Sequence, residues 1–242
     1  MSALLEVRGI SKSFRGLRAV ANAQFEVRQG GIVALIGPNG AGKTTCFNMI
    51  AGVFSPDAGE IVFEGARIDG RRPDEICIAG IGRTFQIVKP FAGLSVLDNV
   101  IVGAFNRTSH LAEARAAAEA ILERLGLGPK RDLPASSLTL PDRKRLEVAR
   151  ALATRPKLLL LDEVMAGLRP TECDQMVEVF RELNRKDGLT ILLIEHVMRA
   201  VMALAGHIVV LHHGEIIARG TPQEVVRDPA VLECYLGEET EV

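Results

Sequence analysis

The chain has 242 residues, of which 48% are hydrophobic, with 29 basic and 30 acidic residues for a net charge of −1. This is enough for one large domain with a buried core. The balanced charge excludes a bulk attraction to nucleic acid, so nucleic acid is not an expected partner and any anion site must be local. The four cysteines lie far apart without a CxxC pair, which favours a reduced intracellular protein.

The N-terminal stretch MSALLEVRGISKSF has no charged leader followed by a long apolar region, so we expect no signal peptide. No stretch approaches the roughly 18 consecutive apolar residues of a membrane span. We therefore expect a cytoplasmic chain. If it serves a membrane process, another chain must cross the bilayer.

Two kinds of strand are predicted along the chain. Alternating patterns predict antiparallel strands at 4–8, 19–27 and 60–64. Five runs are apolar without alternation, which is typical of strands covered on both faces in a mostly parallel sheet. These runs are 31–37, 81–85, 157–162, 189–195 and 207–212.

Helical patterns separate the apolar runs, so the predicted core is α/β. One helix is expected from Thr44 to Ile50, and another carries an apolar stripe at 176–183 and ends near Gly188. A helical insertion is expected from about Val88 to Arg155. Near the C-terminus we expect a hairpin that turns at 213–214, followed by a short helix at 222–228.

The segment GPNGAGKTT contains the pattern G-x-x-x-x-G-K-[ST] between a buried strand and a helix, the context that a phosphate-binding loop requires. Its glycines let backbone N–H groups surround phosphate oxygens. Lys43 supplies a charge to the β- and γ-phosphates, and Thr44 a hydroxyl ligand to Mg²⁺. The pattern covers Gly37, Pro38, Asn39, Gly40, Ala41, Gly42, Lys43 and Thr44.

Polar residues follow three other predicted core strands. Asp162 and Glu163 end the run LLLLDE, where open α/β sheets place their ligands. Asp162 can hold the hydration shell of Mg²⁺, and Glu163 can orient or deprotonate an attacking water. An acid there could also be the first residue back in solvent. His196 in IEHV and Gln86 in GRTFQ have similar positions, although a lone histidine is more often structural.

The segment LTLPDRKRLEVARAL, residues 138–152, predicts a helix with a polar first turn. This turn carries Thr139 and Asp142, followed by three consecutive cations. Helix starts favour anions because of their unpaired N–H groups and their dipole. The alternative is a solvated, capped surface helix.

Together, GPNGAGKTT, RTFQ, LTLPDRKRLEVARAL, LLLLDE, MAGL and IEHV resemble, in order and spacing, the ATP-binding cassette (ABC) ATPases over essentially the whole chain. Among these the chain is most similar to the ATPase subunits of branched-chain amino acid importers, although lipopolysaccharide-export ATPases are similar too. The resemblance implies one domain over 1–242 with a P-loop NTPase core, an antiparallel β subdomain and a helical subdomain at about 88–155. It implies ATP and Mg²⁺ as cofactors.

The resemblance also implies roles for individual residues. Phe14 falls where an aromatic ring stacks on adenine, with core packing as the alternative. Thr45 is a further phosphate contact. Gln86 matches the glutamine that links the Mg²⁺ site to the membrane subunit, Asp162 and Glu163 match the Walker B pair, and His196 matches the histidine that reaches the γ-phosphate.

Two segments depart from the family pattern. The signature Leu-Ser-Gly-Gly-Gln, which binds the γ-phosphate of ATP held by the opposite cassette, reads Leu-Thr-Leu-Pro-Asp here. Both glycines are absent, a proline removes one N–H donor, and Asp142 adds negative charge, whereas Thr139 keeps a hydroxyl. Arg169 stands where an aspartate usually contacts the partner. We therefore expect a weaker site wherever this signature completes it.

The resemblance implies membrane permease subunits and a second cassette as partners, with a heterodimer favoured over a homodimer. An extracellular or periplasmic substrate-binding protein is an indirect partner. The expected location is peripheral, on the inner face of the cell membrane. Two alternatives stay open at this point, a lipopolysaccharide-export cassette and an ATP-dependent clamp or regulator outside transport.

Overall fold

The structure is a computed structural model that describes residues 3–86 and 89–236. Its centre is a six-stranded sheet in the order β10-β9-β3-β8-β7-β6, in which all neighbours are parallel except the β9–β10 pair. The strands are β3 (Ile32–Ile36), β6 (Ile81–Arg83), β7 (Leu158–Asp162), β8 (Thr190–Ile194), β9 (His207–His212) and β10 (Glu215–Gly220). The mostly parallel α/β core expected from the apolar runs is confirmed.

The central strands are apolar along their whole length because layers cover both faces of the sheet. Leu35 and Leu160 point into one hydrophobic cluster, together with residues of α1 (Lys43–Ile50) and the antiparallel strands. Ile36 and Leu161 point into the other cluster, with α6 (Pro170–Asp187) and α7 (Met198–Leu204). The sheet is therefore held rigidly, which fixes the position of its carboxyl edge.

The second sheet is antiparallel, in the order β2-β1-β4-β5. Its strands are β1 (Ala3–Phe14), β2 (Leu17–Arg28), β4 (Ala58–Phe63) and β5 (Ala66–Arg67). β1 is longer than the predicted strand 4–8 because several register shifts against β2 interrupt the period-two alternation. β5 and the helix α2 (Pro73–Ala79) were not predicted.

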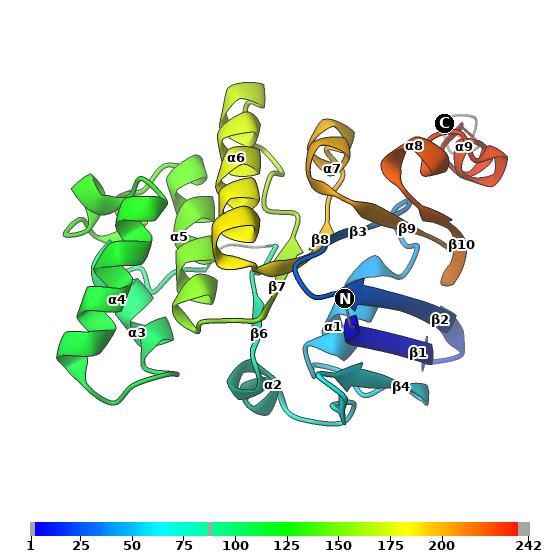
Figure 1. The fold of residues 1–242 in the computed structure, drawn as a ribbon, viewed down its shortest axis with the longest axis horizontal. Coiled ribbons are helices and arrows are strands. Elements are labelled where there is room, and N and C mark those ends of the chain that lie inside the picture. The colour runs from blue at the N-terminus through cyan, green and yellow to red at the C-terminus, as the bar shows by residue number, and fades with distance from the viewer. Residues whose placement is uncertain (1–2, 87–88, 237–242) are drawn as a thin grey trace.

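Three helices stand to one side of the sheets in Figure 1, namely α3 (Val96–Ala104), α4 (Leu111–Arg124) and α5 (Leu140–Ala153). α4 lies farthest from the sheet, and α5 stands beside α6. They occupy the region of the expected helical insertion, whose predicted first residue, Val88, lies outside the described residues. Short 3₁₀ turns at Gly128–Lys130 and Ala135–Ser137 lead into α5.

The end of the described chain forms the predicted hairpin. His213 and Gly214 connect β9 to β10 with φ values of 46° and 82°, the two positive φ values of a type I′ turn. Helix α8 (Pro222–Val225) begins where expected but ends three residues before the predicted end at 228, and α9 (Pro229–Leu236) was not predicted. Among the described residues, no helix is long and apolar enough to cross a membrane.

Candidate active site

The carboxyl ends of four parallel strands bring the predicted residues together. The phosphate-loop segment follows β3, Glu163 follows β7, and His196 lies just beyond β8. β6 ends at Arg83 rather than at Phe85 as predicted, and beyond it the Asp162 N–H of β7 donates to the hydroxyl of Thr84 rather than to a backbone carbonyl. Gln86 lies in the segment that follows.

The loop between β3 and α1 can be built only with glycine at two positions. Gly37 has a φ of 146°, and a Cβ there would lie 1.9 Å from the carbonyl oxygen of Leu211. Gly42 has a φ of 102°, and its Cβ would lie 2.3 Å from a backbone oxygen. A Cβ on Gly40, with a φ of 79°, would meet open space. The loop thus packs tightly on one side and leaves backbone accessible on the other, as a phosphate cradle requires.

Lys43 is the first residue of α1 and is buried. Its Nζ donates to the carbonyl oxygens of Gly37 and Pro38 at 2.6 and 2.7 Å, so the loop wraps around the ammonium group. Thr44 and Thr45 follow in the first turn, with Thr44 exposed and Thr45 half-buried. A cation and two hydroxyls are therefore gathered at a helix N-terminus that already favours anions.

The carboxylate of Glu163 is held from both sides. Gln86 Nε2 donates to Glu163 Oε2 at 2.6 Å, and His196 Nε2 lies 3.0 Å from Glu163 Oε1. Three segments that the sequence analysis selected separately thus meet around one carboxylate. A carboxylate held in this way at the edge of a phosphate loop can orient a water molecule and accept its proton.

Asp162 ends β7 and is 2% exposed. Its Oδ2 accepts a hydrogen bond of 2.9 Å from Arg83, which also donates to Asn48 Oδ1 on α1. Asp162 Oδ1 is buried and has no hydrogen-bond partner among the described residues. This unpaired buried acceptor fits the hydration shell of a bound Mg²⁺, since Mg²⁺ prefers carboxylates and waters.

Phe14, at the end of β1, is 38% exposed. Its ring makes an edge-to-face contact with Phe54, with centroids 5.2 Å apart, and the Nζ of Lys12 lies 5.8 Å from its centroid. The ring is therefore neither a core residue nor fully free. This exposure contradicts the alternative of core packing for Phe14, and adenine stacking stays a prediction.

At the start of α5, Asp142 is bonded to neighbours that the sequence does not predict. Asp142 is 5% exposed, and its Oδ2 accepts hydrogen bonds from Lys130 and, at 2.7 Å, from the hydroxyl of Thr139. Burial alone would raise the pKa of Asp142, but these two donors lower it below its usual value. Asp142 therefore carries the negative charge that the sequence predicts, and Lys130 and Thr139 compensate that charge within the chain. The hydroxyl proton of Thr139 is already engaged within its own chain.

The three cations of α5 also do not form one basic patch. Arg143 donates to the carbonyl of Leu138, and Arg145 donates to the side chain of Gln175. Lys144 is buried. The two arginines thus fasten α5 to neighbouring segments, and the lysine points into the protein.

Four further residues shape the site and were not predicted as site residues, namely Arg83, Lys130, Lys144 and Glu195. Arg83 and Glu195 were visible as charged residues inside or directly after apolar strands. Lys130 carried no such signal, because its pairing with Asp142 is made between a 3₁₀ turn and α5.

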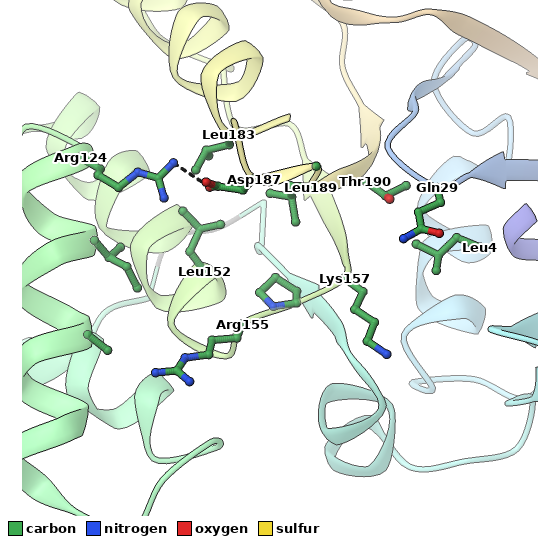
Figure 2. A pocket seen from close by; sticks show the side chains of 14 residues that line it. Leu4, Gln29, Arg124, Leu152, Arg155, Lys157, Leu183, Asp187, Leu189 and Thr190 are labelled. Atoms are coloured by element: carbon green, nitrogen blue, oxygen red, sulfur yellow. Dashed lines mark hydrogen bonds and ion pairs between the residues drawn. The ribbon is translucent and has the colours of Figure 1, made fainter. Parts of the chain in front are cut away.

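A pocket of about 500 Å³ lies at the opposite edge of the sheet. Figure 2 shows its walls, where Arg124 of α4 pairs with Asp187 of α6 above the apolar side chain of Leu152. Lys157 and Thr190, at the amino-terminal ends of β7 and β8, also line it. It is therefore separate from the site at the carboxyl edge.

A phosphate loop, a partly unpaired buried carboxylate and a second carboxylate held by Gln and His define a nucleoside-triphosphate hydrolase of the P-loop class. Residues 20–166 match the family described as ABC transporter, and residues 215–241 match the family described as Branched-chain amino acid ATP-binding cassette transporter. The chain belongs to the ABC transporter family, as an ATP-hydrolysing cassette.

Relatives of known name match along almost the whole chain. The high-affinity branched-chain amino acid transport ATP-binding protein LivG of Salmonella typhimurium is 40% identical, covering 97% of this chain and 98% of its own. BraF of Pseudomonas aeruginosa, with the same description, is 37% identical over 97% and 98%. The lipopolysaccharide export system ATP-binding protein LptB of Acidithiobacillus ferridurans is 35% identical and covers both chains fully.

Among solved structures, the ADP conformation of MJ1267, an ATP-binding cassette of an ABC transporter, has a TM-score of 0.89 at 32% identity, covering 98% of this chain and 100% of its own. A nucleotide-free ATP-binding cassette from an ABC transporter has a TM-score of 0.88 at 32% identity, over 97% and 99%. The fold expected from the resemblance is thus confirmed.

Proposed function

We propose that the chain is the ATPase subunit of an importer for branched-chain or related amino acids, bound to permease subunits at the inner face of the cell membrane. The observation that carries this proposal is the combination of a full-length similarity to LivG and BraF with the match of 215–241 to the branched-chain cassette family. Identity to the lipopolysaccharide-export relative is lower, at 35%.

In the proposed reaction, the backbone of the phosphate loop and Lys43 hold the phosphates of ATP. Glu163 orients the attacking water and accepts its proton, and the bonds from Gln86 and His196 keep its carboxylate in place. His196 would also reach the γ-phosphate. Phe14 would stack on adenine.

Mg²⁺ would be held by the hydroxyl of Thr44, by Gln86 and by Asp162 through its unpaired Oδ1. It would neutralise the charge that develops on the β- and γ-phosphate oxygens. Arg83 keeps Oδ2 of Asp162 occupied, which leaves Oδ1 for the metal side.

Two cassettes would enclose the nucleotides, and Thr139 at the start of α5 would face ATP bound by the partner. Leu140 and Pro141 replace the glycines there, and the Thr139 hydroxyl donates to Asp142, so few donors remain for a phosphate. The guanidinium of Arg169 is exposed and has no ion pair within the described part of the chain, which leaves it available to a partner's carboxylate. These features support a heterodimer with a cassette that has a regular signature.

The permease would dock on a groove of about 270 Å³ between α2, α3 and α5. Phe85 and Phe91, which line it, are 56% and 45% exposed. Such apolar exposure is typical of a protein interface. Phe85 directly precedes Gln86, so docking there would be adjacent to the catalytic carboxylate.

Transport by reconstituted vesicles tests this proposal. The chain is purified with the permease, cassette and binding-protein products of neighbouring genes, and ATP-dependent uptake of radiolabelled leucine is measured beside that of a basic amino acid. Leucine uptake that stops in Glu163→Gln supports the proposal. ATP hydrolysis without uptake of any branched-chain amino acid would contradict the substrate assignment.

A further inference from the structure

Two buried charged side chains lie against the turn that carries Glu163. Lys144, from α5, is 4% exposed, and Glu195, directly after β8, is 2% exposed. Lysine and glutamate are almost never buried to this extent unless they have partners. The partners of these two are therefore informative.

Both side chains bind the backbone of the same turn. Lys144 Nζ donates to the carbonyl oxygen of Glu163 at 2.9 Å and has a longer contact of 3.5 Å with the carbonyl oxygen of Gln86. Glu195 Oε1 accepts from the backbone N–H of Met165 at 2.9 Å. The turn is thus held at its first and third residues by one hydrogen-bond donor and one acceptor, contributed by two different elements.

The turn needs such support because its first residue is strained. Glu163 has a φ of 50°, in the left-handed region that residues other than glycine rarely adopt. A conformation of this kind persists only where its surroundings over-determine it. The Glu163 carboxylate, bonded to Gln86 and His196, can keep its position only if the backbone beneath it keeps its own.

The electrostatic surroundings agree with this role. Burial lowers the pKa of Lys144, and the carboxylates of Glu195, Glu163, Asp162 and Glu147 oppose that shift. Burial raises the pKa of Glu195 to about 7. A charged donor makes a stronger hydrogen bond to a carbonyl than a neutral one does.

We infer that Lys144 and Glu195 are positioning residues. Their hydrogen bonds to the Glu163–Met165 turn, called the clamp from here on, fix the backbone and so orient the Glu163 carboxylate toward the water that attacks the phosphate. Lys144 lies one helical turn after the first residue of α5, so the clamp also ties the signature helix to the catalytic carboxylate. The inference depends on ATP hydrolysis by this family and not on the transported substrate.

Matched variants test the clamp. Lys144→Met keeps the approximate length of the side chain and removes the donor. Because removal of one buried charge can destabilise the fold, thermal unfolding checks that the variant is folded before its kinetics are measured. Lys186→Met, on the exposed end of α6, is the control. We expect Lys144→Met to lower kcat by on the order of 10- to 100-fold, as small displacements of catalytic groups do. KM for ATP and the binding of a fluorescent ATP analogue should stay within about twofold.

A second pair of variants separates the hydrogen bond from the charge. Glu195→Gln keeps an acceptor for the Met165 N–H, and Glu195→Leu removes it. Glu195→Leu should therefore lose more turnover than Glu195→Gln. Hydrogen exchange of the peptide 161–168 should be several-fold faster in Lys144→Met and Glu195→Leu than in Lys186→Met, whether or not the preparation turns over ATP.

The inference is overturned if kcat of Lys144→Met stays within twofold of wild type. It is overturned equally if kcat and ATP binding fall together, because that pattern indicates general damage to the site. Unchanged exchange of 161–168 in both clamp variants would exclude the clamp without any measurement of turnover.

Discussion

The carboxyl edge of the sheet and the start of α5 show opposite relations to the family pattern. At the carboxyl edge, Lys43, Asp162, Glu163 and His196 match the family pattern in sequence, and Gln86 and His196 both bond to the Glu163 carboxylate. At the start of α5 the glycines are replaced, and Asp142 closes a local network with Thr139 and Lys130. In the proposed dimer, one chain would thus combine a complete hydrolytic half-site with an altered contribution to its partner.

The difference teaches that the two halves of a shared site can vary separately. Residues that act on the chain's own ATP are tied to a rigid sheet, so a change in one disturbs the others. In the proposed dimer the signature would act on ATP held by another chain, and its altered residues bond to one another locally.

Glu163→Gln gives the largest expected effect. Loss of the proton acceptor should lower ATP turnover by about 10²- to 10⁴-fold while the phosphate loop still binds ATP. Phosphate release measures turnover, and size-exclusion chromatography with ATP should show a trapped dimer. Undiminished phosphate release would show that another group is the base.

Restoring the family signature should have the next largest effect. Leu140→Gly, Pro141→Gly and Asp142→Gln together would return neutral donors to the helix start. We expect about tenfold more turnover in the homodimer, the value of one regained charge-assisted hydrogen bond. Asp142→Gln alone is the control, and it should gain much less because the glycines are still absent. No gain from the triple variant would mean that the natural helix start suffices.

Glu195→Gln should change how stability depends on pH. The pKa of Glu195 is raised to about 7 by burial, so the folded chain keeps a proton that the unfolded chain loses from about pH 4.5 upwards. Wild-type stability from this group therefore falls as pH rises towards 7 and then levels off. The free energy of unfolding of Glu195→Gln minus that of wild type should increase by about 1 kcal/mol from pH 6 to pH 8, as measured by urea unfolding. A difference independent of pH would contradict the raised pKa.

Lys130→Met, on the signature side, should have the smallest effect. Lys130 is 40% exposed in its side chain, so its pair with Asp142 is partly screened by solvent. Its loss should cost about 0.5–1 kcal/mol in urea unfolding, with a larger cost at low salt. Lys186→Met, whose ion pair with Glu182 is exposed on both sides, should cost less.

The sequence predicts the central sheet well because continuous apolar runs and strand-end polar residues are local signals. It predicts the phosphate loop because backbone conformation there demands glycine at fixed spacing. α2 and the short β5 were not predicted, because neither is long enough to show a periodic pattern of apolar residues. The environment of Asp142 could not be predicted because it depends on Lys130, twelve residues earlier and on another element.

The same limit applies to the inner parts of the site. That Lys144 turns inward to the carbonyl of Glu163 depends on how α5 packs against the sheet, which no local pattern encodes. Likewise, Arg83 reads as the end of a strand, and only the fold brings it to Asp162 and Asn48. The residues predicted to do chemistry can be selected by their spacing, whereas the contacts around them required the structure.

The most direct test of this asymmetry is ATP turnover by the purified chain alone and after mixing with a cassette that has a regular glycine-bearing signature. We predict low ATP turnover by the chain alone and high turnover in the mixture. Turnover of the mixture should be lost when Glu163 of this chain is changed to Gln. It should be largely kept when only the partner's catalytic glutamate is changed. Equal, Glu163-dependent turnover by the chain alone would contradict the account.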